Sequence, residues 1–97
     1  MKTNVTFRHT KGTHPELQET ATKLAEGFQK YHDNITSTNV EFINDNEKEV
    51  HIVVNLTGTT LTAHESSDDF HKSLHEAADK MITQIKKIKT KQLSSRG

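Results

Sequence analysis

One amphipathic segment, residues 66–92, constrains the fold more than any other part of this chain. Its apolar residues recur at steps of three and four and are Phe70, Leu74, Ala77, Ala78, Met81, Ile85 and Ile88. This spacing places one apolar stripe along the side of a helix. Ser66 followed three residues later by Asp69 matches a capping pattern, and Asp68 adds negative charge at the positive end of the helix dipole. The segment therefore predicts a long helix with one buried face.

The charge of the chain is distributed unevenly. Its 13 basic and 13 acidic residues give a formal net charge of zero. All 13 acidic residues precede residue 80, and from there on the charged residues are Lys80, Lys86, Lys87, Lys89, Lys91 and Arg96. The neutral average therefore conceals a cationic C-terminal segment.

Length and composition restrict the class of protein. A chain of 97 residues makes one domain that buries roughly 60–65% of the surface of its unfolded state. The absence of cysteine excludes a disulfide framework and thiolate metal sites. The first residues lack the apolar segment of a signal peptide, and no run approaches the ~18 apolar residues of a membrane span. We therefore expect a soluble cytoplasmic domain over residues 1–92 and a disordered tail over residues 93–97.

The first third of the chain predicts a strand and then a helix. Residues 2–9 alternate between polar side chains and the apolar Val5 and Phe7, which is typical of a strand with one buried face. A helix is expected to begin at residues 13–16, where a threonine lies three residues before a glutamate and proline occupies the first turn. Its expected end is about His32, and its apolar stripe is Leu17, Ala21, Leu24, Phe28 and Tyr31.

Three further strands are expected before the last helix. Residues 38–43 and 49–57 alternate in the same way, with a turn at residues 44–47 between them. A hairpin turn at Gly58-Thr59 would start the next strand. In that register Leu56 faces Leu61, Val54 faces Ala63 and Ile52 faces Glu65.

The predicted order of elements is βαβββα. One apolar stripe on each helix and one apolar face on the sheet place both helices on the same side, which is an α+β two-layer sandwich. The helical connection favours a right-handed parallel crossover between the first two strands, and the short turns require antiparallel neighbours for the others. The four-stranded sheet is therefore expected to be mixed.

No group of residues forms a catalytic pattern. His71 and His75 have the i, i+4 spacing of metal ligands, but no third ligand is evident nearby, so we interpret them as boundary residues and predict no metal site. His51 and His64 fall on the polar side of neighbouring strands, where they would lie diagonally across the hairpin. The chain has no glycine-rich phosphate loop and no nucleophile elbow, so we expect neither an enzyme nor a cofactor.

The lysines are the candidate binding residues. At about 100° per residue, Lys80, Lys87 and Lys91 share one flank of the second helix, and Lys23 and Lys30 share one flank of the first. Two adjacent helices with such flanks would present both rows to a single polyanion. The alternative is an ordinary solvated helix face whose C-terminal lysines complement the helix dipole.

These features together resemble the bacterial ribosome hibernation-promoting factors, also called ribosome-associated translation inhibitors. The most specific segment is Asp68-Asp69-Phe70 with Asp79-Lys80-Met81, followed by Gln84, Lys86, Lys87, Lys89 and Lys91. The initial strand, residues 31–35 and residues 58–63 also match, so the resemblance covers essentially the whole chain. The length is similar to that of a short form, without the C-terminal domain of long members.

The resemblance implies a non-enzymatic, RNA-binding inhibitor of translation with a fold like a double-stranded-RNA-binding domain. Such a protein occupies the mRNA and tRNA channel of the small ribosomal subunit and contacts 16S rRNA through both helices. By position the implied RNA-binding residues are Lys80, Lys86, Lys87, Lys89, Lys91, Lys23 and Lys30. The first helix departs from the family pattern, with Gln18, Leu24 and Gly27 at places where relatives carry basic residues. The alternative is a divergent member that binds a protein partner.

Overall fold

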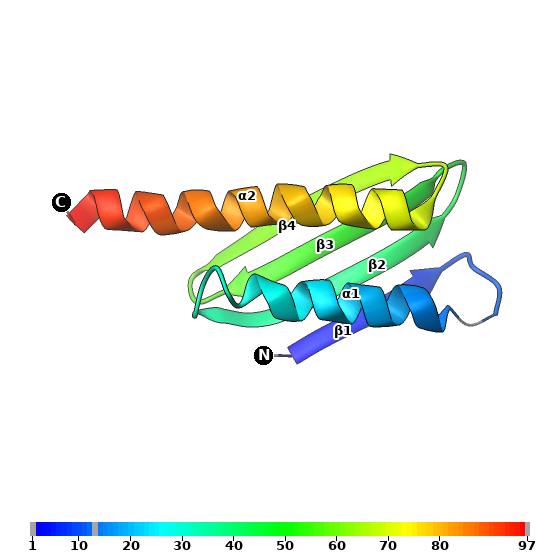
Figure 1. Ribbon diagram of the computed structural model, residues 1–97, viewed down its shortest axis with the longest axis horizontal. Coiled ribbons are helices and arrows are strands. Elements are labelled where there is room, and N and C mark those ends of the chain that lie inside the picture. The colour runs from blue at the N-terminus through cyan, green and yellow to red at the C-terminus, as the bar shows by residue number, and fades with distance from the viewer. Residues whose placement is uncertain (1, 13, 97) are drawn as a thin grey trace.

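The chain folds into a four-stranded sheet that is covered on one face by two helices (Figure 1). The computed structural model describes residues 2–12 and 14–96, and their side chains as far as residue 88. The elements in this part of the chain are β1 (Lys2–Arg8), α1 (Pro15–Phe28), β2 (Ile35–Asn44), β3 (Lys48–Leu56), β4 (Thr59–Ser67) and α2 (Phe70–Arg96). The predicted α+β fold and its βαβββα order are confirmed.

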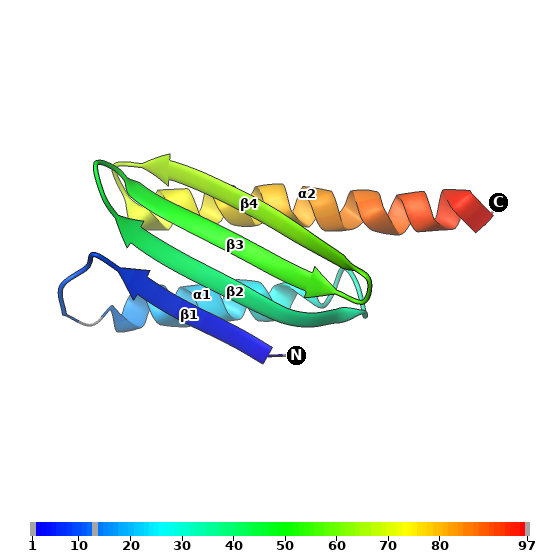
Figure 2. The same cartoon turned by 180° about the vertical axis from the view of Figure 1, so that it is seen from behind.

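The sheet has the strand order β1-β2-β3-β4. β1 pairs with β2 in parallel, because the chain crosses back through α1 between them, and the other two pairs are antiparallel. The mixed sheet is therefore confirmed. Figure 2 shows the second face of the sheet, which neither helix covers.

The core lies between the sheet and the helices. Val40, Ile52 and Ala63 are paired across β2, β3 and β4 and point toward the helices. The main buried residues from all layers are Leu17, Ala21, Phe28, Val40, Phe42, Val50, Ile52, Val54, Leu56, Leu74, Ala77, Ala78, Met81 and Ile85. The apolar stripes that the sequence predicts are thus the surfaces that pack together.

The hairpin between β3 and β4 has a register different from the predicted one. The turn is Thr57-Gly58, and Gly58 adopts a φ of 82°, a left-handed conformation that glycine tolerates at no steric cost. As a result Val54 pairs with Leu61, and the cross-strand partner of Ile52 is Ala63. The predicted pairs were wrong by two residues. Because side chains alternate with a period of two, the same residues still face the helices.

Helix α1 ends earlier than the sequence predicted. It stops at Phe28, and the following amides of Gln29, Lys30 and Tyr31 bond carbonyl oxygens three residues back. This tighter turn replaces the helix that was expected to reach about His32. Pro15 lies in the first turn as predicted. The expected capping residue Thr13 lies outside the described residues.

Helix α2 begins later than predicted, at Phe70. Strand β4 continues through Ser67, so Ser66 belongs to the strand and does not cap the helix. The cap is Asp69, whose carboxylate accepts a hydrogen bond from the His71 amide at 3.2 Å. At its other end α2 extends to Arg96, well beyond the end of the sheet (Figure 1), and it includes most of the segment that was expected to be a tail.

Candidate nucleic-acid interface

Two lysines of α2, Lys80 and Lys87, lie on the side of the helix that faces β4. Gln84, which is between them on the same flank, donates a hydrogen bond from Nε2 to the Thr62 carbonyl oxygen at 2.7 Å. Lys80 forms an ion pair with Glu65, which also belongs to β4. The flank therefore borders the edge strand of the sheet, and it faces away from α1.

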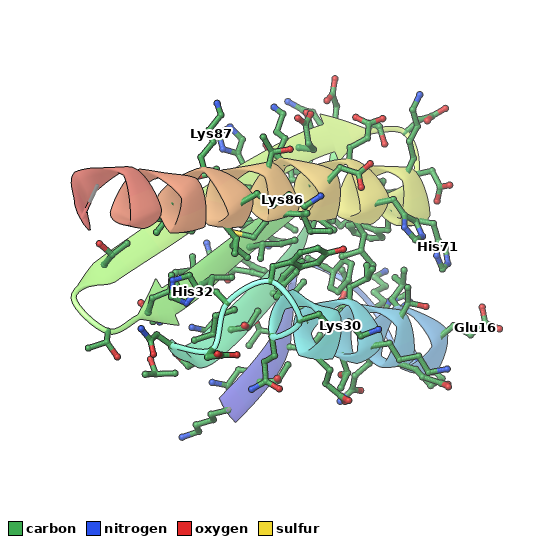
Figure 3. The ribbon with its side chains drawn as sticks, turned by 60° about the vertical axis from the view of Figure 1, so that its left-hand side comes forward. Glu16, Lys30, His32, His71, Lys86 and Lys87 are labelled. Carbon is green, nitrogen blue, oxygen red and sulfur yellow. The ribbon has the colours of Figure 1, made fainter. Side chains whose placement is uncertain are left out.

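Lys86 lies on the opposite flank of α2. Its Nζ is 5.2 Å from the centre of the Tyr31 ring, in the turn that follows α1. Figure 3 shows Lys86 and Lys30 directed to the same outer side of the helix pair, whereas Lys87 points away from α1. The cation–π contact holds Lys86 where α1 ends, at a gain of about 0.5–1 kcal/mol for an exposed site.

The sequence suggested that the lysine rows of the two helices would form one shared surface for a polyanion, and the structure does not show that arrangement. Lys80 and Lys87 lie on the β4 side, and the described α2 lysine that approaches the end of α1 is Lys86. A polyanion that touched all three lysines would have to follow the outer surface of α2 rather than a single groove between the helices.

The described lysines differ in how much of their charge is already paired. Lys23 forms an i, i+4 ion pair with Glu19 at 3.0 Å, and both side chains are largely exposed. Such a pair contributes about 0.3–0.5 kcal/mol and is easily exchanged. Lys30, Lys86 and Lys87 are exposed and have no carboxylate partner among the described side chains. No described carboxylate therefore competes with a ligand for these three lysines.

Two of the predicted binding residues lie beyond the last described side chain. Lys89 and Lys91 belong to the part of α2 that extends past the sheet, and their side chains lie outside the described part of the structure. Their role stays a prediction.

The histidines form pairs without forming a metal site. His51 and His64 are direct cross-strand partners with ring centres 5.3 Å apart, so the diagonal placement was wrong. His71 and His75 are both exposed on α2. Among the described residues no group of three or more His, Cys, Asp or Glu side chains has the arrangement needed to hold a metal ion.

The contacts of Glu65 and Tyr31 were not found from the sequence. Tyr31 belongs to the expected apolar stripe of the first helix, and nothing in its spacing indicates a contact with Lys86. Glu65 follows the buried Ala63 of β4 by two residues, so the alternation of the strand places its side chain on the face toward α2. The strand pattern therefore indicates the side of the sheet on which Glu65 lies, but it does not identify Lys80 as its partner.

The fold and the site define a small α+β domain with a cationic helical surface. A family model described as Sigma 54 modulation protein / S30EA ribosomal protein matches residues 3–93. The chain therefore belongs to this family, and the resemblance to the ribosome hibernation-promoting factors is confirmed at the level of the family.

Solved structures show the same architecture. A ribosomal subunit interface protein from Coxiella burnetii is 27% identical, with a TM-score of 0.79 over 91% of this chain and 98% of that chain. The N-terminal domain of Protein Y from Thermus thermophilus is 18% identical, with a TM-score of 0.80 over 91% of this chain and 99% of that one. The second likeness concerns the fold alone. A comparison with curated protein sequences finds no match. In the described part of the chain, neither helix combines the length and the apolar character that crossing a membrane requires.

Proposed function

We propose that this protein is a non-enzymatic inhibitor of translation. It binds 16S rRNA in the mRNA and tRNA channel of the small ribosomal subunit, beside neighbouring ribosomal proteins, and keeps idle ribosomes inactive. It acts in the cytoplasm under stress and in stationary phase, as a monomer when it is off the ribosome, and it needs no cofactor. Membership in the S30EA ribosomal protein family supports an association with the ribosome.

The observation that carries the proposal is the exposed charge on the second half of α2. Lys86 and Lys87 are exposed on two sides of the helix, and no acidic residue follows Asp79 in the sequence. The C-terminal end of α2, which follows these two lysines, extends past the sheet (Figure 1). A projecting cationic helix is suited to lie between RNA segments, because each lysine that neutralises a phosphate releases a bound counterion.

The proposed contact residues divide into two groups. Lys30, Lys86 and Lys87 are ready to bind phosphate, and Lys89 and Lys91 continue the same helix. Lys23 and Lys80 must first exchange Glu19 and Glu65 for a phosphate. We therefore expect the first group to contribute more to affinity than the second.

The alternative is a protein-binding module on the same fold. The observation in its favour is that Glu19 and Glu65 partly neutralise the lysines of a chain whose net charge is already zero. Binding to rRNA through several lysines would weaken steeply as salt increases, whereas an apolar protein interface would change little. A salt series on small-subunit binding therefore separates the two functions.

The double variant Lys86→Glu and Lys87→Glu tests the proposal. Cosedimentation with purified small subunits at moderate salt should fall to background, because two attractive charges become repulsive. The double variant Lys2→Glu and Lys72→Glu is the matched control, since it changes the net charge equally at two exposed positions elsewhere. Binding by the first variant that equals that of the control would contradict the proposal. Circular dichroism checks that both variants remain folded.

A further inference from the structure

A surface pocket of about 400 Å³ lies at the end of the molecule where both helices begin. Its walls come from the connection between β1 and α1, from the end of β2, from the start of β3 and from Phe70. Lys11, Lys48, His9 and His14 contribute the basic and imidazole groups of its lining. The described lining contains no carboxylate, although the surface next to Lys48 includes Glu47 and Asp68.

Aromatic rings form part of the same pocket. Phe70 contacts Phe42 edge-on with ring centres 5.4 Å apart, and Lys48 Nζ is 5.6 Å from the centre of the Phe70 ring. His14 lies against Phe7 with ring centres 5.3 Å apart. The pocket therefore combines flat apolar surfaces with two ammonium groups. Bases that are not paired in RNA are bound by stacking, and phosphates are bound by lysine.

His14 connects this pocket to a second one of about 340 Å³ at the start of α1, which is also lined by Glu16, Leu17 and His71. The His14 Nε2 atom is buried and has no hydrogen-bond partner among the described residues, which is unfavourable for a buried polar group. His14 is also the residue before α1, and its side chain does not cap the helix. Figure 3 shows His71 and Glu16 at this same end of the molecule.

We propose that this pocket, formed by His9, Lys11, His14, Lys48 and Phe70, binds an unpaired nucleotide of RNA. The base lies against the aromatic rings, and the phosphate is held by the two lysines. The positive N-terminal end of the α1 helix dipole adds a smaller attraction for the phosphate. The inference rests on the proposed function, because it takes the RNA to be ribosomal. It adds a contact at the end of the molecule opposite to the projecting C-terminal end of α2.

The backbone of His9, which lines the pocket, has an uncommon conformation. His9 has a φ of 59°, a left-handed conformation that is uncommon outside glycine. It directly follows β1, at a bend of the chain. Such outliers persist where the surrounding structure holds them, and they often occur at binding sites.

Nuclear magnetic resonance on the full chain tests the inference. Titration with uridine 5′-monophosphate should shift the amide signals of His9, Lys11 and His14 and leave those of Lys86 and Lys87 in place. Uridine 5′-monophosphate should bind more tightly than inorganic phosphate, because the base adds its own contacts. Equal affinity for the two, or shifts confined to α2 beyond Lys80, would overturn the inference.

Variants then connect the pocket to RNA. For a short single-stranded oligouridylate, Lys11→Gln and Lys48→Gln should each reduce the slope of log K against log salt by about 0.7. Lys2→Gln, at the other end of β1, is the matched control and should leave the slope unchanged. An unchanged slope in both pocket variants would overturn the inference while small-subunit binding through α2 persists. Failure of the unmodified protein to bind small subunits would instead contradict the proposed function.

Discussion

Lys80 of α2 is paired with Glu65 of β4, so the first lysine of the cationic segment is neutralised by a carboxylate that precedes it in the chain. The Lys80 side chain is 61% exposed and that of Glu65 is 20% exposed. At such exposure an ion pair contributes about 0–1 kcal/mol to stability. Its main effect is therefore on the electrostatic surface: it withholds one positive charge from a polyanionic partner.

Removal of this carboxylate should strengthen binding. In Glu65→Gln, Lys80 is free to contact a phosphate, so affinity for the small subunit should rise and the salt slope should become steeper by about 0.7–0.9. Filter binding or cosedimentation over a salt series measures both quantities. Glu19→Gln, which releases Lys23 on α1, provides the comparison for the other helix. Weaker binding by Glu65→Gln would show that the pair serves the bound state.

Leu74 should be a major contributor to stability. Its side chain is fully buried in the core between α2 and the sheet. Leu74→Ala should lower the free energy of unfolding by roughly 2–5 kcal/mol, because it removes apolar burial and leaves a cavity. Urea denaturation measures the change, and Lys72→Ala on the exposed side of the same helix should stay within about 0.5 kcal/mol. A loss below about 0.5 kcal/mol for Leu74→Ala would place this residue outside the core.

Ser73 joins the start of α2 to the sheet through a buried hydroxyl. It is fully buried, its Oγ donates a hydrogen bond to the Lys48 carbonyl oxygen at 2.7 Å, and it also lies 2.7 Å from the Ser67 Oγ. Ser73→Ala should cost about 1–3 kcal/mol, since it leaves buried polar partners unsatisfied. Thr83→Ala is the matched control, because its hydroxyl bonds the Asp79 carbonyl on an exposed surface. Thermal or urea melts should separate the two variants clearly, and equal effects would refute the assignment.

Replacement of Gly58 and of Gly27 by alanine should change the stability of the protein in opposite directions. Gly58 has a φ of 82° in the turn between β3 and β4, so Gly58→Ala should destabilise by about 1 kcal/mol or more. Gly27 lies inside α1, and a Cβ there would meet nothing within 4 Å. Gly27→Ala should therefore stabilise by about 0.4–1 kcal/mol. Denaturant midpoints of the two variants should lie on either side of the parent value, and a shift in the same direction would contradict this explanation.

Zinc should not bind tightly at His71 and His75. Both imidazoles are exposed, and two ligands leave the tetrahedral coordination of zinc incomplete. Isothermal titration calorimetry should show no submicromolar site. A tight site that disappears in His71→Ala would prove this prediction wrong.

The spacing of apolar residues was sufficient to predict the helices and strands and the face that each of them buries. The stripe containing Leu74, Met81 and Ile85 and the alternation of Ile52 and Val54 correspond to the observed core. Element ends were less accurate. His32 was placed in the first helix, but it is buried in the turn that follows, where its Nδ1 accepts a hydrogen bond from the Asn34 amide. That burial depends on neighbours that are distant in sequence, so helical periodicity does not contain it.

The candidate site was predicted in part. The sequence identifies α2 as cationic, because charge is a property of each residue, and the shared flank of Lys80 and Lys87 follows from about 100° per residue. The partners of the α2 flanks do not follow from the helix alone. Glu65 and Tyr31 became neighbours of α2 only through the rotation of that helix against the sheet.

The sequence by itself determined which face of each helix and strand is apolar and how many layers the domain has, since the apolar faces follow from spacing along each element. The tertiary structure alone decided the register of the β3–β4 hairpin and the pairing of Lys80. It also brought Lys11, His14 and Lys48 to one pocket. The physical reason is that register, helix rotation and pocket formation depend on how separate elements fit together, and a period of 2 or 3.6 residues contains no information about that fit.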